Sequence, residues 1–242
     1  MNYMFRLANP NRFLRTGRAI LPWSAGLSIL CIGAGLYLGL FVSPPDYQQK
    51  ETVRIMYVHV PSAWMALLIY SSMAISSAMA LIWKHSLADL IAKASAPVGA
   101  GFTLICLATG SLWGKPMWGT WWVWDARLTS VLILFFLYLG YIALNNAFDD
   151  PARGAKASAV LALVGAVNLP IIKFSVDWWN TLHQPASVTR LDVPAVHSSM
   201  LWPLLLMALG FTFFYVTILV LRVRSEIAAA KIRNIQLAEA RG

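Results

Sequence analysis

Tryptophan is concentrated in one short stretch of this 242-residue chain. Five of the 11 tryptophans fall within 12 residues, at Trp113, Trp118, Trp121, Trp122 and Trp124. Indole rings offer large, rigid and mostly apolar surfaces against which a flat apolar molecule can pack. The alternative is an interfacial belt, but belts place Trp and Tyr at both faces of a membrane protein, and this stretch is denser than anchoring requires. We therefore interpret it as a binding surface.

The four histidines are candidate metal ligands. His85 follows a lysine in a short charged connection, so we expect a solvated surface residue. His197 begins the last apolar stretch, where an interfacial or hydrogen-bonding role is expected and ligation is the alternative. His59 and His183 lie in separate polar segments beside apolar stretches, and these segments could converge on the tryptophans. These two are the candidate ligands.

Other common chemistry finds no support in the sequence. Cys31 and Cys106 lie far apart within apolar stretches and form neither a C-x-x-C nor a C-x-x-C-H pattern, so we expect inert core thiols. The short polar connections contain no glycine-rich nucleotide loop, and no side chain stands out as a catalytic nucleophile. We expect a binding protein rather than an enzyme.

Long apolar stretches predict the architecture. Apolar residues make up 59% of the sequence and charged residues 12%, a composition typical of multi-pass membrane proteins. About 20 mostly apolar residues suffice to cross the hydrocarbon core. The fifth stretch is the weakest, because it contains Pro170 and reaches full length only if Lys173 extends its amine outward. The predicted transmembrane spans are about 19–42, 61–83, 94–113, 128–148, 157–176 and 198–221, in a single all-α membrane domain over residues 1–242.

Positive charge predicts the orientation. With six transmembrane helices both termini share one side, and that side carries 13 of the 19 Lys and Arg residues. Cytoplasmic segments are enriched in these residues, so we expect both termini in the cytoplasm and segments 43–60, 114–127 and 177–197 on the outer face. The net charge of +9 then reflects this bias and attraction to anionic lipid, and it gives no argument for nucleic acid.

The centre of the tryptophan stretch carries a recognisable motif. Residues 118–129 read WGTWWVWDARLT, which matches the signature W-G-x-x-W-x-W-D-x-R-L-T of the tryptophan-rich (WWD) haem-handling proteins of cytochrome c maturation. The chain resembles this family over nearly its whole length. Its six spans, with one histidine before the second and one in the last outer segment, are similar to the CcmC branch. The larger synthetase-type members have more spans and further histidines.

The resemblance implies a haem site on the outer face. In the family, the positions of His59 and His183 match the two axial ligands of haem b iron. Haem is a flat, mostly apolar macrocycle with two anionic propionates, so its site needs apolar planes, axial ligands and cations. The loop at 114–127 would supply the platform. The predicted haem-contacting residues are Trp113, Gly114, Trp118, Gly119, Trp121, Trp122, Trp124, Asp125 and Arg127.

Three roles within this site stay open in the sequence. Asp125 precedes a predicted helix, so it is placed to cap that helix, and it is also placed to orient an indole. Arg127 is a candidate partner for a propionate, for Asp125 or for lipid phosphate. Arg54 and Arg190 are equally plausible propionate partners by location.

The resemblance also implies partners in a bacterial inner membrane. The haem acceptor would be the periplasmic chaperone CcmE, which takes haem covalently through its own histidine. The small protein CcmD and the ABC-type subunits CcmA and CcmB would complete the assembly, and ATP hydrolysis would belong to those subunits.

Two other functions fit the composition of the spans less well. A membrane b-type electron-transfer cytochrome usually places its histidines in mid-helix, and no predicted span has a central histidine. A haem exporter subunit should carry polar residues along a transmembrane path, yet the five clearest spans contain no charged residue. Haem binding and transfer is therefore the leading hypothesis.

Overall fold

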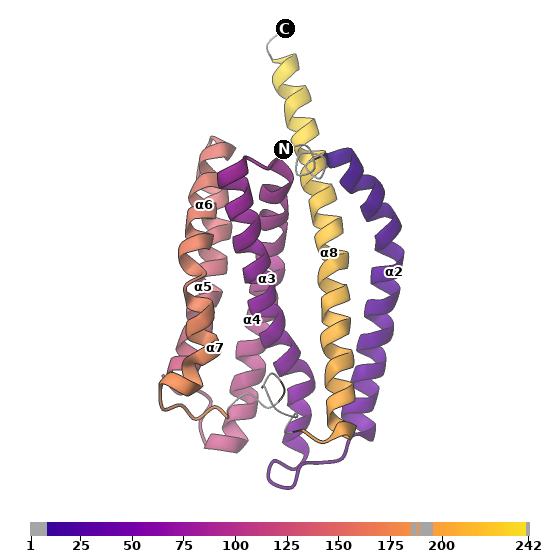
Figure 1. Cartoon of the computed structure of the whole chain (residues 1–242), viewed down its shortest axis with the longest axis vertical. Coiled ribbons are helices and arrows are strands. Elements are labelled where there is room, and N and C mark those ends of the chain that lie inside the picture. The colour runs from indigo at the N-terminus through magenta and orange to yellow at the C-terminus, as the bar shows by residue number, and fades with distance from the viewer. Residues whose placement is uncertain (1–8, 185–187, 189–195, 241–242) are drawn as a thin grey trace.

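The computed structural model describes residues 9–184, 188 and 196–240, and these residues form a helical bundle (Figure 1). Six segments are long and apolar enough to cross a membrane, which confirms the predicted all-α membrane fold. A π-helical turn over Leu38–Val42 continues the first helix, and a 3-10 segment over Glu51–Ile55 leads into the second. The α-helices are α2 (Pro10–Tyr37), α3 (Met56–Trp83), α4 (Ser86–Trp118), α5 (Ala126–Asn146), α6 (Pro151–Gly165), α7 (Asn168–Trp178) and α8 (Ser198–Glu239).

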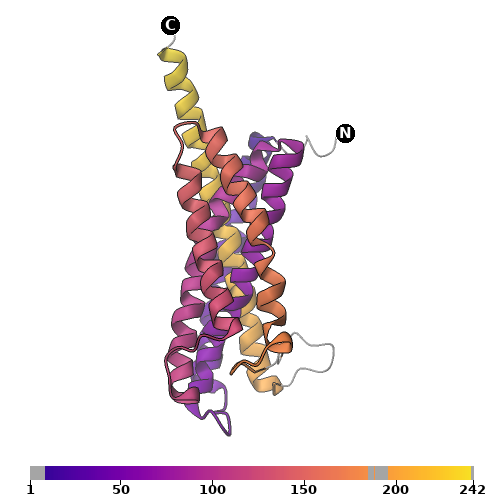
Figure 2. The same ribbon diagram turned by 90° about the vertical axis from the view of Figure 1, so that its left-hand side faces the viewer.

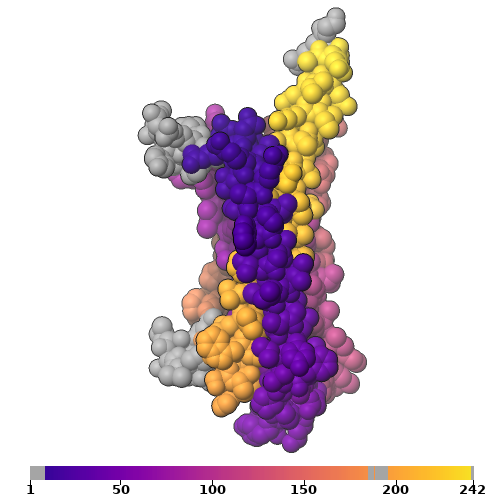
Figure 3. All heavy atoms as spheres, turned by 90° about the vertical axis from the view of Figure 1, so that its right-hand side faces the viewer, coloured from indigo at the N-terminus to yellow at the C-terminus, as the bar shows by residue number. Residues whose placement is uncertain are grey.

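The helices form a central pair with a group on either side. Helices α3 and α4 pack together in the middle, α2 pairs with α8 on one side, and α5, α6 and α7 cover the other (Figures 1 and 2). The first turn of α2 and the last turns of α8 lie at the same end of the bundle (Figure 1). Figure 3 shows α8 running along α2 and projecting beyond it at that end. Helix α4 runs away from that end, so the connection between α4 and α5 lies at the opposite end (Figure 1).

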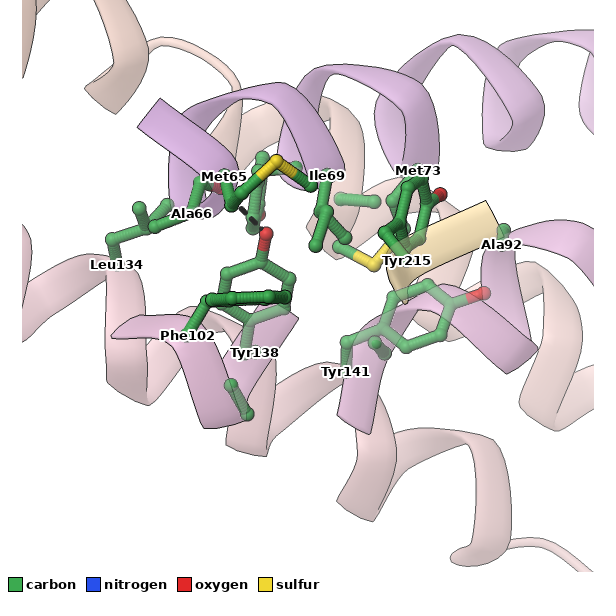
Figure 4. Packing of buried hydrophobic residues seen from close by; sticks show 14 of the residues in the cluster. Met65, Ala66, Ile69, Met73, Ala92, Phe102, Leu134, Tyr138, Tyr141 and Tyr215 are labelled. Atoms are coloured by element: carbon green, nitrogen blue, oxygen red, sulfur yellow. Dashed lines mark hydrogen bonds between the residues drawn. The ribbon is translucent and has the colours of Figure 1, made fainter. Parts of the chain in front are cut away.

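Aromatic, aliphatic, methionine and alanine side chains fill the centre of the bundle (Figure 4). Tyr138 of α5 is fully buried, and its hydroxyl donates to the carbonyl oxygen of Ala66 on α3 at 2.7 Å. Its ring meets that of Tyr70 edge to face, with centroids 5.0 Å apart. Gly99 of α4 lies against the Tyr138 ring, where any Cβ atom would overlap it. A glycine is therefore required for α4 and α5 to pack this closely.

The pairing of α2 with α8 also depends on small residues. A Cβ atom at Gly210 would lie 2.9 Å from the backbone nitrogen of Ile32. The Ser28 hydroxyl donates to the carbonyl oxygen of Gly210 at 3.1 Å, and the Thr217 hydroxyl donates to the hydroxyl oxygen of Ser24 at 2.9 Å. Lipid tails are as apolar as the side chains, so no hydrophobic force drives helices together in a membrane. Helices associate there through close packing at small residues and through interhelical hydrogen bonds.

Two helices extend into segments that the sequence assigned to outer loops. α3 begins at Met56, ahead of the span predicted from residue 61, and contains Pro61 near its start. α4 continues to Trp118, so the first five residues of the predicted loop 114–127 are helical. Gly119 ends α4 with a φ of 76°, and its N–H bonds the carbonyl oxygen of Lys115 at 3.0 Å.

The fifth span consists of two helices. α6 ends at Gly165 and α7 begins at Asn168, two residues before Pro170, whose nitrogen has no hydrogen to donate to the carbonyl of Ala166. The Asn168 amide donates to the carbonyl oxygen of Ser130 on α5 at 2.8 Å, which satisfies a polar group at the break. Proline thus interrupts the span that the sequence treated as continuous.

His85 is not the solvated residue that the sequence predicted. Its side chain is only 7% exposed, and Nδ1 accepts a hydrogen bond from the N–H of Ala88 at 3.1 Å. It therefore caps the N-terminus of α4, a role usually taken by Ser, Thr, Asp or Asn.

Candidate functional site

Residues of the predicted outer segment 43–60 meet the tryptophan stretch at the end of the bundle opposite the termini. Trp113, near the end of α4, donates its indole N–H to the side-chain oxygen of Gln49 at 2.9 Å. The same indole meets the ring of His59 edge to face, with centroids 5.6 Å apart. Segment 43–60 is thereby joined to the tryptophan stretch through Gln49, a contact that no local sequence pattern indicates.

His59 lies in the first turns of α3, with its ring directed toward α4. Its Nδ1 lies 3.1 Å from the carbonyl oxygen of Cys106 and 3.1 Å from the Thr109 hydroxyl. Because a carbonyl oxygen only accepts, Nδ1 carries a proton, and in the neutral imidazole Nε2 therefore keeps its lone pair. Gly110 admits the ring, since a Cβ atom there would lie 3.0 Å from His59 Cε1. Among the described residues, His59 Nε2 has no hydrogen-bond partner.

His183 brings the third predicted outer segment into the same region. Its ring lies against Trp118, with centroids 5.0 Å apart, and Nδ1 lies 3.7 Å from Oδ2 of Asp125. Burial lowers the pKa of His183, while the Asp125 carboxylate acts in the opposite direction. The lowered pKa favours the neutral imidazole, which is the form that binds a metal. His59 and His183 come from segments about 120 residues apart in sequence, and the structure brings both to the same end of the bundle.

Asp125 caps α5, as one interpretation of the sequence predicted. Its Oδ1 accepts from the N–H of Leu128 at 2.7 Å, and the residue is 9% exposed. The other oxygen faces His183 rather than an indole. The sequence did not predict this contact, since residues 125 and 183 belong to different segments and no local pattern links them.

The candidate arginines have protein partners. Arg127 donates from Nε to the hydroxyl of Ser175 on α7 at 2.6 Å, and it interacts electrostatically with Asp125. Arg54 forms an ion pair with Glu51 at 2.5 Å and donates to a backbone carbonyl oxygen near the end of the first helix. Arg190 lies outside the described residues. Arg127 is therefore held beside the site by α7, a contact that the sequence did not indicate.

The remaining tryptophans divide into covered and exposed groups. Trp122 is partly buried, and its indole N–H is a buried donor without a partner among the described residues. Its ring lies edge to face against Trp124, which is 75% exposed. Trp121 is also exposed, as are Trp178 and Trp179 at the end of α7. The two indoles that contact the histidines, Trp113 and Trp118, are partly covered, whereas the exposed indoles of the loop and of the end of α7 form a rim.

The arrangement suits a flat ligand that carries a metal at its centre. Two neutral imidazoles come from different elements. In each ring Nδ1 faces a protein acceptor, and Nε2 has no protein partner among the described residues. Indole surfaces lie beside both rings. The roles of all nine predicted contact residues and of the two histidines as ligands remain predictions.

The family profile and the individual relatives that match this chain agree on one family. The profile of a family described as heme exporter protein C matches residues 3–238. The heme exporter protein C of Bradyrhizobium diazoefficiens is 55% identical over 97% of this chain and 89% of its own length. That of Haemophilus influenzae is 50% identical over 91% of this chain and 89% of its own. A putative cytochrome c biosynthesis ccmC-like mitochondrial protein of Marchantia polymorpha is 52% identical over 79% of this chain and 81% of its own length.

Proposed function

The chain belongs to the heme exporter protein C (CcmC) family of haem-handling membrane proteins, and we propose that it holds haem b between His59 and His183 and delivers it to the chaperone CcmE. The observation that carries this proposal is the pairing of two imidazoles at one end of the bundle, each with Nε2 without a partner among the described residues. Imidazole nitrogen is a common axial ligand of haem iron.

The surroundings of the two histidines fit the porphyrin as well as its iron. Trp113 and Trp118 place indole faces and edges beside the imidazoles. Arg127 supplies a cation near the histidines, where a propionate would form a charge-assisted hydrogen bond. The exposed indoles of the rim leave one side open to solvent or to a partner. A donor needs such access, because the acceptor must reach the edge of the macrocycle.

The proposed setting is a complex in the bacterial inner membrane, with the site on the periplasmic face. CcmD and the ABC-type subunits CcmA and CcmB would be the partners in the membrane. The printed sequence contains no nucleotide-binding loop, so the role proposed for this chain is binding and positioning, with ATP hydrolysis on another subunit. The excess of Lys and Arg on the side of the termini supports this orientation.

The orientation predicts which loops react with a membrane-impermeant maleimide. In intact cells we expect Tyr47→Cys, whose position is 79% exposed near the proposed site, to be labelled. Phe148→Cys, in the connection between α5 and α6, should be labelled only after lysis. Both native cysteines are buried, so background labelling of the parent chain should be low. Labelling of position 148 but not 47 in intact cells would reverse the orientation and place the site in the cytoplasm.

If this chain delivers haem to the chaperone, haem should become covalently attached to the chaperone. The purified, haem-loaded full chain is mixed with the soluble domain of the chaperone, and haem that stays on the chaperone in denaturing gels is measured. We expect transfer from the parent chain and from His197→Ala, a matched control because His197 is an exposed histidine that caps α8. His183→Ala should lose transfer. Normal haem occupancy without any transfer would favour an electron-transfer cytochrome instead.

A further inference from the structure

The two carboxylate oxygens of Asp125 face different partners. Oδ1 accepts from the N–H of Leu128 at 2.7 Å and caps α5. Oδ2 is buried and has no hydrogen bond among the described residues. Helix capping therefore accounts for the position of Oδ1 but not for the burial of Oδ2. A buried carboxylate oxygen without a partner carries a substantial desolvation cost.

The atom that faces Oδ2 is equally without a partner. His183 Nδ1 lies 3.7 Å away, is buried, and makes no hydrogen bond among the described residues. A hydrogen bond between these atoms would need a separation of about 2.7–3.2 Å, so a shift of about half an ångström to one ångström would form it. His183 lies in a loop after α7, where such a shift breaks no helical hydrogen bond.

We propose that Asp125 is the positioning residue of His183, accepting the Nδ1 hydrogen through Oδ2 and so directing Nε2 toward the haem iron. The inference rests on the proposed function, since it assigns a task to a neighbour of a proposed ligand. A ligand histidine characteristically donates its second N–H to a carboxylate or a carbonyl, which fixes the tautomer and the ring orientation. Asp125 thus has two roles: Oδ1 caps α5, and Oδ2 orients a ligand on another segment.

The two histidines are then oriented by different groups. His59 donates to the neutral carbonyl oxygen of Cys106, whereas His183 would donate to an anionic carboxylate. Hydrogen bonds to an ionised acceptor are stronger than neutral ones, and a carboxylate partner raises the basicity of the ligand. The geometry therefore assigns the more basic of the two imidazoles to the loop that carries His183.

Asp125→Asn separates this task from helix capping, because asparagine is also a preferred N-cap residue. With its oxygen on the N–H of Leu128, the amide would present an NH₂ group to His183 Nδ1, and two donors cannot bond. We expect the haem-free Asn variant to melt near the parent temperature, while haem binding weakens by about 10–100-fold and the haem reduction potential rises. Asp125→Ala, which loses the cap too, should also lower the melting temperature.

Chemical rescue distinguishes failure of this inference from failure of the proposed function. In His183→Gly we expect added imidazole to restore the low-spin haem spectrum at a concentration about tenfold below that of 1-methylimidazole, which has no N–H to donate. The same comparison in the His183→Gly, Asp125→Asn double variant should show a much smaller preference. An equal preference in both backgrounds would overturn the role of Asp125. A haem spectrum unchanged by His183→Gly would overturn the ligand assignment itself.

Discussion

Alanine at His59 or at His183 is expected to convert bound haem from a low-spin, six-coordinate form to a high-spin form. Each change removes one of the two imidazoles that the bundle brings to the same end from different segments. Loss of an outer-shell partner typically costs about 10–100-fold in metal affinity, and loss of a ligand should cost at least as much. Absorption and electron paramagnetic resonance spectra of the purified variants, with titration of haem, measure both effects.

His197→Ala is the control for this experiment, since it removes a histidine whose Nδ1 is engaged with Ser199. It should leave the haem spectrum unchanged. If the His59 and His183 variants keep the low-spin spectrum of the parent, neither residue is a ligand, and another nitrogen or sulfur atom must bind the iron. A spectrum that changes only in the His197 variant would move the site to the start of α8.

Alanine at Gly99 is expected to destabilise the bundle strongly, although alanine is the better helix former. The added Cβ atom would overlap the ring of Tyr138, whose own position is fixed by its hydrogen bond to Ala66. Overpacking of this kind costs about 1–3 kcal/mol. The midpoint of thermal or detergent-induced unfolding, followed by circular dichroism in the purified protein, should fall accordingly.

Gly101→Ala provides a matched control on the same helix. No atom lies within 4 Å of the position that its Cβ atom would take, so this variant should be as stable as the parent or slightly more so. Equal unfolding midpoints for the two alanine variants would show that α4 and α5 are packed less tightly at Tyr138. Gly99→Ala combined with Tyr138→Leu should recover part of the loss, because the smaller side chain makes room for the methyl group.

The sequence predicted most of the fold because lipid imposes a simple rule. An apolar run of about 20 residues crosses the membrane as a helix, and the six predicted spans overlap the six helical segments observed. Errors occur where this rule does not apply. The second span was predicted to begin at Pro61, whereas α3 begins at Met56 and contains Pro61 near its start. The break before Asn168 depends on a hydrogen bond to Ser130, on another helix.

The candidate site was less predictable than the fold, since its contacts join distant segments. The motif pointed to the tryptophan stretch, and the histidines were noted for their place between spans. No local pattern indicates that Ser175 accepts from Arg127 or that Asp125 faces His183. His85 was misread because a lysine beside it indicated solvent, whereas its imidazole caps α4. Such pairings are set by how helices pack.

The length of α8 has a consequence for folding. Its 42 residues span about 63 Å at 1.5 Å per residue, whereas a bilayer with its headgroups is about 40–45 Å thick. Roughly the last dozen residues of α8 therefore extend beyond the bilayer into water. An isolated peptide of that length would be marginally helical, because the first turn is costly to form. Here the membrane-length part of α8 serves as the nucleus, and the projecting turns need only propagate from it.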